Sequence, residues 1–167
     1  QAGFMLFSLF ALSGMAKEGL ILYTAAYSLA SIGIFAILVK MNDYTIDGFN
    51  GLAKQQPVLA ITATIFLLSL TGIPLTAGFQ SKFYMLLAAV QNGQHTWLVI
   101  LAVLCAALSA YYYFRVIQAM YFKDSAGAEM AESGDITISF KVLLVITAVL
   151  IIVLGIFPGF LTDWLYF

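Results

Sequence analysis

Lys82 is the residue of this sequence whose type and position most clearly predict chemistry. It is the only Lys, Arg, Asp or Glu between Lys54 and Arg115, and it lies in the longest apolar run of the chain. Burying a lysine in a membrane costs roughly 2.5–3.5 kcal/mol on insertion scales, so its side chain needs water or a partner. Ionisable groups at such positions usually mark ion or proton paths. We therefore expect Lys82 to carry protons; the alternative is a structural lysine permanently paired with an acid.

The segment around Lys82 predicts a helix that breaks in its middle. As one helix, residues 57–92 would be roughly 54 Å long, whereas the hydrocarbon core of a membrane is about 30 Å thick. Pro74 lacks the N–H that would bond the carbonyl of Leu70, and glycines lie on both sides of it. We expect half-helices near 58–70 and 79–91 to flank an irregular segment, residues 71–78. The residues that define this break are Thr71, Gly72, Pro74 and Gly78.

The expected break also predicts partners for Lys82. In the first turn of the second half-helix, the ammonium group would be disfavoured by the helix N-terminus and favoured by free carbonyls of Ser69, Leu70 and Thr71. Irregular backbone persists at membrane depth only where protein or water surrounds it. A lysine under these opposing influences can exchange its proton, as a transport site requires.

Composition places the chain in a membrane. It has 167 residues, of which 63% are hydrophobic and 9% charged, and its mean hydropathy is +1.01. An ordinary soluble domain is about 25% charged. The net charge of −1 argues against nucleic acid as a partner, and the single cysteine, Cys105, excludes a multi-cysteine metal site within this chain. We predict an all-α, polytopic transmembrane helix bundle that contacts the lipid bilayer.

The apolar runs predict a single membrane domain over residues 1–167. The first run, residues 2–16, is too short for a comfortable span, and Lys17-Glu18-Gly19 would form the turn after it. Because the chain opens with Gln1 and enters this run at once, we expect a fragment that begins inside a longer protein. The other predicted spans are residues 20–39, 57–92 with the break at 71–78, 97–122 and 138–157.

Two further residues are candidates for proton transport. His95 lies in the predicted turn of residues 91–96, where it is either a proton relay or simply solvated. Arg115 follows three tyrosines and a phenylalanine, so we expect it to reach for lipid headgroups or a carboxylate. A place in a proton path is disfavoured for Arg115, because guanidinium stays charged at working pH.

Basic residues are unevenly divided between the two sides of the predicted topology. The positive-inside rule places the richer side in the cytoplasm or its equivalent, and the C-terminus on the outer side. The basic residues on the richer side are Lys40, Lys54, Arg115, Lys123 and Lys141.

No Gly-rich phosphate loop, metal-spaced His/Cys cluster or Ser/His/Asp set occurs in the sequence, so we expect no cofactor or metal in this chain.

The stretch from Leu68 to Tyr84 resembles the signature of the antiporter-like proton-pumping subunits of respiratory complex I, the NADH-quinone oxidoreductase. The resemblance rests on Gly72-Ile73-Pro74, Gly78-Phe79 and Lys82-Phe83-Tyr84, and it extends to Ala2-Gly3-Phe4-Met5-Leu6 and Tyr111-Tyr112-Tyr113-Phe114-Arg115-Val116-Ile117. The sister M-type subunits commonly carry glutamate at the place of Lys82. The lysine with Phe83-Tyr84 therefore favours the N type within this family.

The resemblance implies an inverted-repeat fold of about fourteen transmembrane helices, of which this chain would hold the last four and part of a fifth. In relatives, the lysine of the Lys-Phe-Tyr motif lies on a broken helix, at the outer end of a chain of charged residues, histidines and waters. Here Lys82 takes that place. Some relatives have histidine where Gln1 stands, which disfavours a relay step through that position in this chain.

Three functions follow from these observations. The first is proton translocation coupled to quinone reduction, with the other membrane subunits of complex I as partners in a bacterial cytoplasmic membrane. Flavin mononucleotide, iron–sulfur clusters and quinone would then be bound by partner subunits, with no redox chemistry in this chain. The second is a cation/proton antiporter or a membrane-bound hydrogenase subunit, which share the broken-helix fold. The third is a membrane scaffold in which Lys82 is a fixed ion pair.

Overall fold

The structure, a computed structural model, describes residues 1–93, 96–124 and 136–163. Its regular elements over these residues are all helices, which confirms the predicted all-α class. Three helices are long and apolar enough to cross a membrane: α2 (Gly14–Val39), α6 (Thr96–Phe122) and α7 (Ile138–Ile156). The other elements are the 3₁₀ helices η1 (Ala2–Met5) and η2 (Asp47–Phe49), and the helices α1 (Leu6–Ala11), α3 (Leu52–Gln55), α4 (Pro57–Thr71), α5 (Ala77–Asn92) and α8 (Gly159–Thr162).

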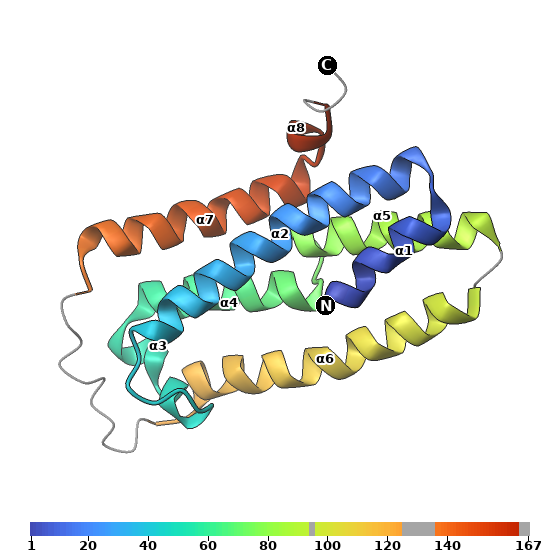
Figure 1. The fold of residues 1–167 in the computed structure, drawn as a ribbon. Coiled ribbons are helices and arrows are strands. Elements are labelled where there is room, and N and C mark those ends of the chain that lie inside the picture. Colours follow the sequence, from blue (N-terminus) through green and yellow to red (C-terminus); the bar gives the residue numbers. More distant parts are fainter. Residues whose placement is uncertain (94–95, 125–135, 164–167) are drawn as a thin grey trace.

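Helices α4 and α5 form the centre of the bundle and follow each other end to end (Figure 1). Helix α2 packs along both of them, while α7 and α6 lie on opposite sides of this central layer in the view of Figure 1. The N-terminal end of the chain lies beside the gap between α4 and α5. The segment around Lys82 is therefore surrounded by helices from most of the chain.

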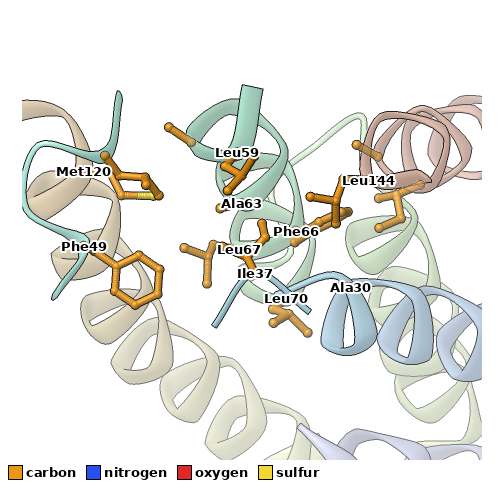
Figure 2. Packing of buried hydrophobic residues seen from close by; sticks show 14 of the residues in the cluster. Ala30, Ile37, Phe49, Leu59, Ala63, Phe66, Leu67, Leu70, Met120 and Leu144 are labelled. Atoms are coloured by element: carbon orange, nitrogen blue, oxygen red, sulfur yellow. The ribbon is translucent and has the colours of Figure 1, made fainter. Parts of the chain in front are cut away.

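The close approach of α2 to α4 fixes the position of α4. Phe66 of α4 is fully buried, and its ring lies where a Cβ on Gly33 of α2 would have to go. Ala30 and Ile37 of α2 and Leu144 of α7 belong to the same buried cluster (Figure 2). Small residues allow helices to pack closely in a membrane, where burial of apolar surface gives little driving force. The result is a rigid support for the C-terminal end of α4.

Helix α2 begins earlier than the sequence predicted. We expected a turn at Lys17-Glu18-Gly19 after a span at 2–16, but these residues are helical and the chain reverses at Leu12 and Ser13. Leu12 adopts a left-handed conformation (φ 45°), and the Ser13 side chain accepts a hydrogen bond from the backbone N–H of Ala16 at 3.2 Å. This N-cap starts the helix. The predicted turn is therefore wrong, because an N-cap four residues before Lys17 provides the better helix start.

Candidate functional site

The C-terminal end of α4 leaves backbone carbonyls free. Gly72 adopts a left-handed conformation (φ 90°), and its N–H donates to the carbonyls of Leu68 and Ser69 at 2.9 and 3.1 Å. The Leu70 carbonyl lacks its helical donor, because the residue four positions later is Pro74. Of the three carbonyls that we expected to be available to Lys82, that of Ser69 is thus already bonded.

Helix α5 begins at Ala77, two residues earlier than we expected. The Thr76 side chain caps it by accepting from the N–H of Phe79 at 3.4 Å, and the Thr76 hydroxyl donates to the Ile73 carbonyl at 2.7 Å. Lys82 is consequently in the second turn of α5, not in the first. The unfavourable effect of the helix N-terminus on its charge is weaker there, because the effect falls off within the first turn.

The Lys82 side chain reaches back from α5 to the end of α4. Its Nζ donates to the carbonyl of Leu70 at 2.7 Å and to that of Thr71 at 3.3 Å, and only 6% of the residue is exposed. The free carbonyls at a helix C-terminus favour a cation. In the described part of the chain, the ion pairs join Lys54 to Asp124 and Lys123 to Asp47, and none involves Lys82. The ammonium group is thus held by neutral acceptors.

Glycines allow the two helix ends to meet around Lys82. A Cβ on Gly78 would occupy the position of the Ser69 carbonyl, and the N–H of Gly78 donates to Ser69 Oγ at 3.2 Å. A Cβ on Gly72 would come within 3.2 Å of Lys82 Cδ and 3.5 Å of Nζ. These two predicted break residues therefore shape the space that the lysine occupies.

A polar network lies next to the ammonium group. The side-chain amide of Gln1 donates to the Leu70 carbonyl at 2.9 Å, the same oxygen that Lys82 binds, and to the hydroxyl of Tyr113 at 3.3 Å. The Tyr23 hydroxyl donates to Gln1 Oε1 at 2.9 Å. A cavity of about 10 Å³ lies between Lys82, Gln1, Tyr23 and Ser69. This volume is at the lower limit for one water molecule, for which Lys82, Gln1, Tyr23 and Ser69 carry polar groups.

The other predicted site residues lie elsewhere. Arg115 is exposed on α6, with its guanidinium carbon 5.9 Å from the centre of the Tyr111 ring, and it is not among the residues that line the Lys82 cavity. His95 lies outside the described residues. Within those residues, no group of three or more His, Cys, Asp or Glu side chains is placed to hold a metal ion.

Sequence reasoning missed two residues around Lys82 and the role of a third. Phe4 places its ring centre 4.9 Å from Lys82 Nζ, and Tyr23 lines the cavity. Ser69 was expected to act through its carbonyl, but its hydroxyl accepts from the N–H of Gly78 at the start of α5. Phe4 and Tyr23 lie far from Lys82 in the sequence, so a single sequence carries no signal of these contacts. The Ser69 hydroxyl in an apolar run was a visible hint, since a buried hydroxyl needs a hydrogen-bond partner.

The fold and the site together define an integral membrane helix bundle with a buried amine at the junction of two helix ends. Residues 1–109 match the family described as NADH:quinone oxidoreductase/Mrp antiporter, TM, and the chain belongs to this family.

Similar proteins agree with this assignment. The chain is 37% identical to NADH-quinone oxidoreductase subunit N 1 of Thermodesulfovibrio yellowstonii over 96% of its length and 34% of that protein's. It is 43% identical to NADH-quinone oxidoreductase subunit N of Bdellovibrio bacteriovorus over 85% of its length and 29% of that protein's. It spans about a third of the length of these curated relatives.

A solved structure gives the same result for the fold. The chain superimposes on a chain of respiratory complex I from Thermus thermophilus, determined with bound aureothin, with a TM-score of 0.81 and 27% sequence identity. The match covers 97% of this chain and 36% of that one. The helix arrangement described above is therefore that of a respiratory complex I chain.

Proposed function

We propose that this chain is the proton-translocating part of a membrane subunit of NADH-quinone oxidoreductase, with Lys82 as the group that binds and releases the proton. The observation that carries the proposal is the surroundings of Lys82: a buried amine that contacts backbone carbonyls and, in the described residues, no carboxylate. Such an amine exchanges its proton without breaking an ion pair. A permanently paired lysine would not do so.

Proton translocation by this chain requires coupling to redox chemistry elsewhere. The relatives are named as subunits N of NADH-quinone oxidoreductase, and the similar solved structure is of respiratory complex I. These names support the other membrane subunits of that complex as partners. Flavin mononucleotide, the iron–sulfur clusters and quinone would be bound by partner subunits, and this chain would contribute the proton path alone.

The placement of basic residues supports a bacterial cytoplasmic membrane location with the C-terminus on the periplasmic side. Lys40, at the end of α2, lies 5.8 Å from the ring centre of Phe140 at the start of α7. Lys54 of α3 pairs with Asp124 beyond the end of α6. Basic residues therefore gather at one end of the bundle, which the positive-inside rule places in the cytoplasm. In this topology, α4 and α5 would cross the membrane together as one broken span.

The test is Lys82→Met in the complete enzyme, reconstituted into sealed vesicles. We expect proton uptake and coupled quinone reduction to fall at least about tenfold with normal assembly, because the change removes the charge and its burial cost of a few kcal/mol. Lys82→Arg should not restore the rate, since guanidinium holds its proton at any working pH. The control is Lys54→Met, at an exposed lysine. Wild-type pumping by Lys82→Met would show that the role of the lysine is structural.

The family description also names the Mrp antiporter, which favours cation/proton exchange as the second candidate. An antiporter exchanges Na⁺ for protons without electron transfer, whereas a complex I subunit pumps only during quinone reduction. Measuring Na⁺ and proton fluxes in the same vesicles with and without NADH separates the two functions.

A further inference from the structure

The ammonium group of Lys82 lies over the face of the Phe4 ring. Lys82 Nζ lies 4.9 Å from the ring centre, over its face, while the same nitrogen donates to the Leu70 carbonyl at 2.7 Å. The face of an aromatic ring carries partial negative charge and attracts a cation within about 6 Å of its centre. The ammonium group therefore contacts two kinds of neutral partner, carbonyl oxygens and a ring face.

Phe4 is held in this position by its own packing. It is 7% exposed, and its buried cluster includes Tyr23 of α2, Met85 of α5 and Ala102 of α6. The ring centres of Phe4 and Tyr23 are 6.4 Å apart. The backbone N–H of Phe4 donates to the Gln1 carbonyl at 3.1 Å within the 3₁₀ turn. Because three helices enclose the ring, the fold fixes its contact with Lys82.

A ring face acts differently from a carboxylate on a lysine that must exchange protons. It attracts the ammonium form and has little effect on the neutral amine, so it changes the ratio of the two forms by roughly 2- to 30-fold. A carboxylate at 4–6 Å changes that ratio by about 10- to 1,000-fold. The ring thus favours the charged form without holding the proton permanently.

We propose that Phe4 is a positioning residue that sets the protonation equilibrium of Lys82 through the face of its ring. This inference rests on the proposed function, because it requires Lys82 to exchange its proton during turnover. The titratable groups that face Lys82 from neighbouring elements are Tyr23 and Tyr27 of α2 in the cavity wall and, through the Gln1 amide, Tyr113 of α6. Helices η1, α1 and α4 contain no Lys, Arg, His, Asp or Glu, and α7 contains only Lys141, near its start.

Fluorination of the ring tests the proposal with almost no change of shape. The complete enzyme carries mono-, di- or trifluorinated phenylalanine at position 4, since each fluorine weakens the attraction of the ring face for a cation. Proton uptake by vesicles is measured from pH 6 to pH 10. We expect the alkaline limb of the rate profile to move to lower pH with each fluorine, and Phe4→Leu to move it by about 0.3–1.5 pH units.

The matched control is the same fluorinated series at Phe66, which is also buried but packs against Gly33. A stepwise shift at position 4 and none at position 66 supports the proposal. Equal shifts at both positions, or superimposable profiles at position 4, would overturn it. If Phe4 variants behave like the wild type while Lys82→Met stops pumping, only this inference fails. If Lys82→Met pumps normally, the proposed function fails and this inference fails with it.

Discussion

Lysine side chains occur in two contrasting surroundings in this molecule. At one end of the bundle, Lys54 pairs with Asp124 at 2.6 Å and Lys123 with Asp47 at 3.4 Å, and all four side chains are about half to nearly fully exposed. In the interior, Lys82 is 6% exposed, and within the described chain its ammonium group contacts backbone carbonyls and an aromatic ring. In these two pairs, the carboxylates accompany lysines that water already solvates.

The exposed and the buried lysines therefore differ in what their positive charge can contribute. Exposed ion pairs contribute about 0–1 kcal/mol each, so the surface acids add little stability and serve mainly solubility and orientation. A carboxylate beside the buried lysine would compensate its charge fully, but it would also make the charged state permanent. Neutral partners compensate only part of the cost of burying the charge, which leaves both protonation states of the lysine accessible. Three changes test this comparison.

The largest effect should come from giving the buried lysine an acid. Gln1→Glu preserves the shape of a side chain whose amide shares the Leu70 carbonyl with Lys82. A carboxylate at that position lies close enough to favour the charged form of Lys82 by about 10- to 1,000-fold. We expect proton release, and with it vesicle proton uptake, to slow at least about tenfold in the complete enzyme.

The control for this change is Gln91→Glu, which places the same group at an exposed position near the end of α5. Its pumping rate should match the wild type. Wild-type pumping by Gln1→Glu would show that a nearby acid does not hold the proton, and the contrast between the two surroundings would lose its functional meaning.

A smaller effect should follow from disturbing the packing of α7 against the segment that joins α4 to α5. A Cβ on Gly155 of α7 would lie 2.5 Å from the Leu75 carbonyl oxygen and 2.7 Å from the Ala77 N, and backbone atoms yield less easily than side chains. Overpacking of this kind costs about 1–3 kcal/mol. We expect Gly155→Ala to lower the melting temperature of the enzyme and to reduce its pumping rate several-fold. Gly14→Ala, where no atom lies within 4 Å, is the control, and equal stability of the two variants would contradict the prediction.

The smallest effect should come from the surface. The hydrogen bond from Lys54, together with its positive charge, lowers the pKa of Asp124. A lowered pKa in the folded state stabilises the fold above the unfolded-state pKa, and this contribution is lost as pH falls through the folded value. Because Asp124 is exposed, we expect Asp124→Asn to leave the melting temperature at pH 7 within experimental error. Any difference in melting temperature between this variant and the wild type should disappear in acid or high salt. A shift of several degrees at pH 7 would refute the prediction.

Much of the fold class was predictable from the sequence. Long apolar runs with few charges allow little except membrane helices, and the spacing of Gly72, Pro74 and Lys82 carried the family resemblance. The start of α2 was not predictable in the same way. Lys17 and Glu18 predict a turn because charges usually end a span, whereas the N-cap Ser13 lies within an apolar run.

The site was predictable only as far as local backbone rules extend. Pro74 and Leu70 are four residues apart, so the free carbonyl follows from the chemistry of proline. The Phe4 ring and the Gln1 amide reach Lys82 through tertiary packing alone. Whether the buried amine would meet an acid or a ring depended on how η1, α2 and α5 pack, and no local pattern carries that information.

The neutral partners of Lys82 have an electrostatic consequence over longer distances. A proton that binds to Lys82 adds one elementary charge to the interior of the bundle, and no ion pair in the described residues holds that charge in place. With an effective dielectric constant of about 20, that charge alters the energy of another unit charge 10 Å away by about 1.7 kcal/mol, roughly a 15-fold change in an equilibrium. In the proposed function, the binding and release of a proton at Lys82 is therefore a signal that a neighbouring ionisable group can detect without any movement of the helices.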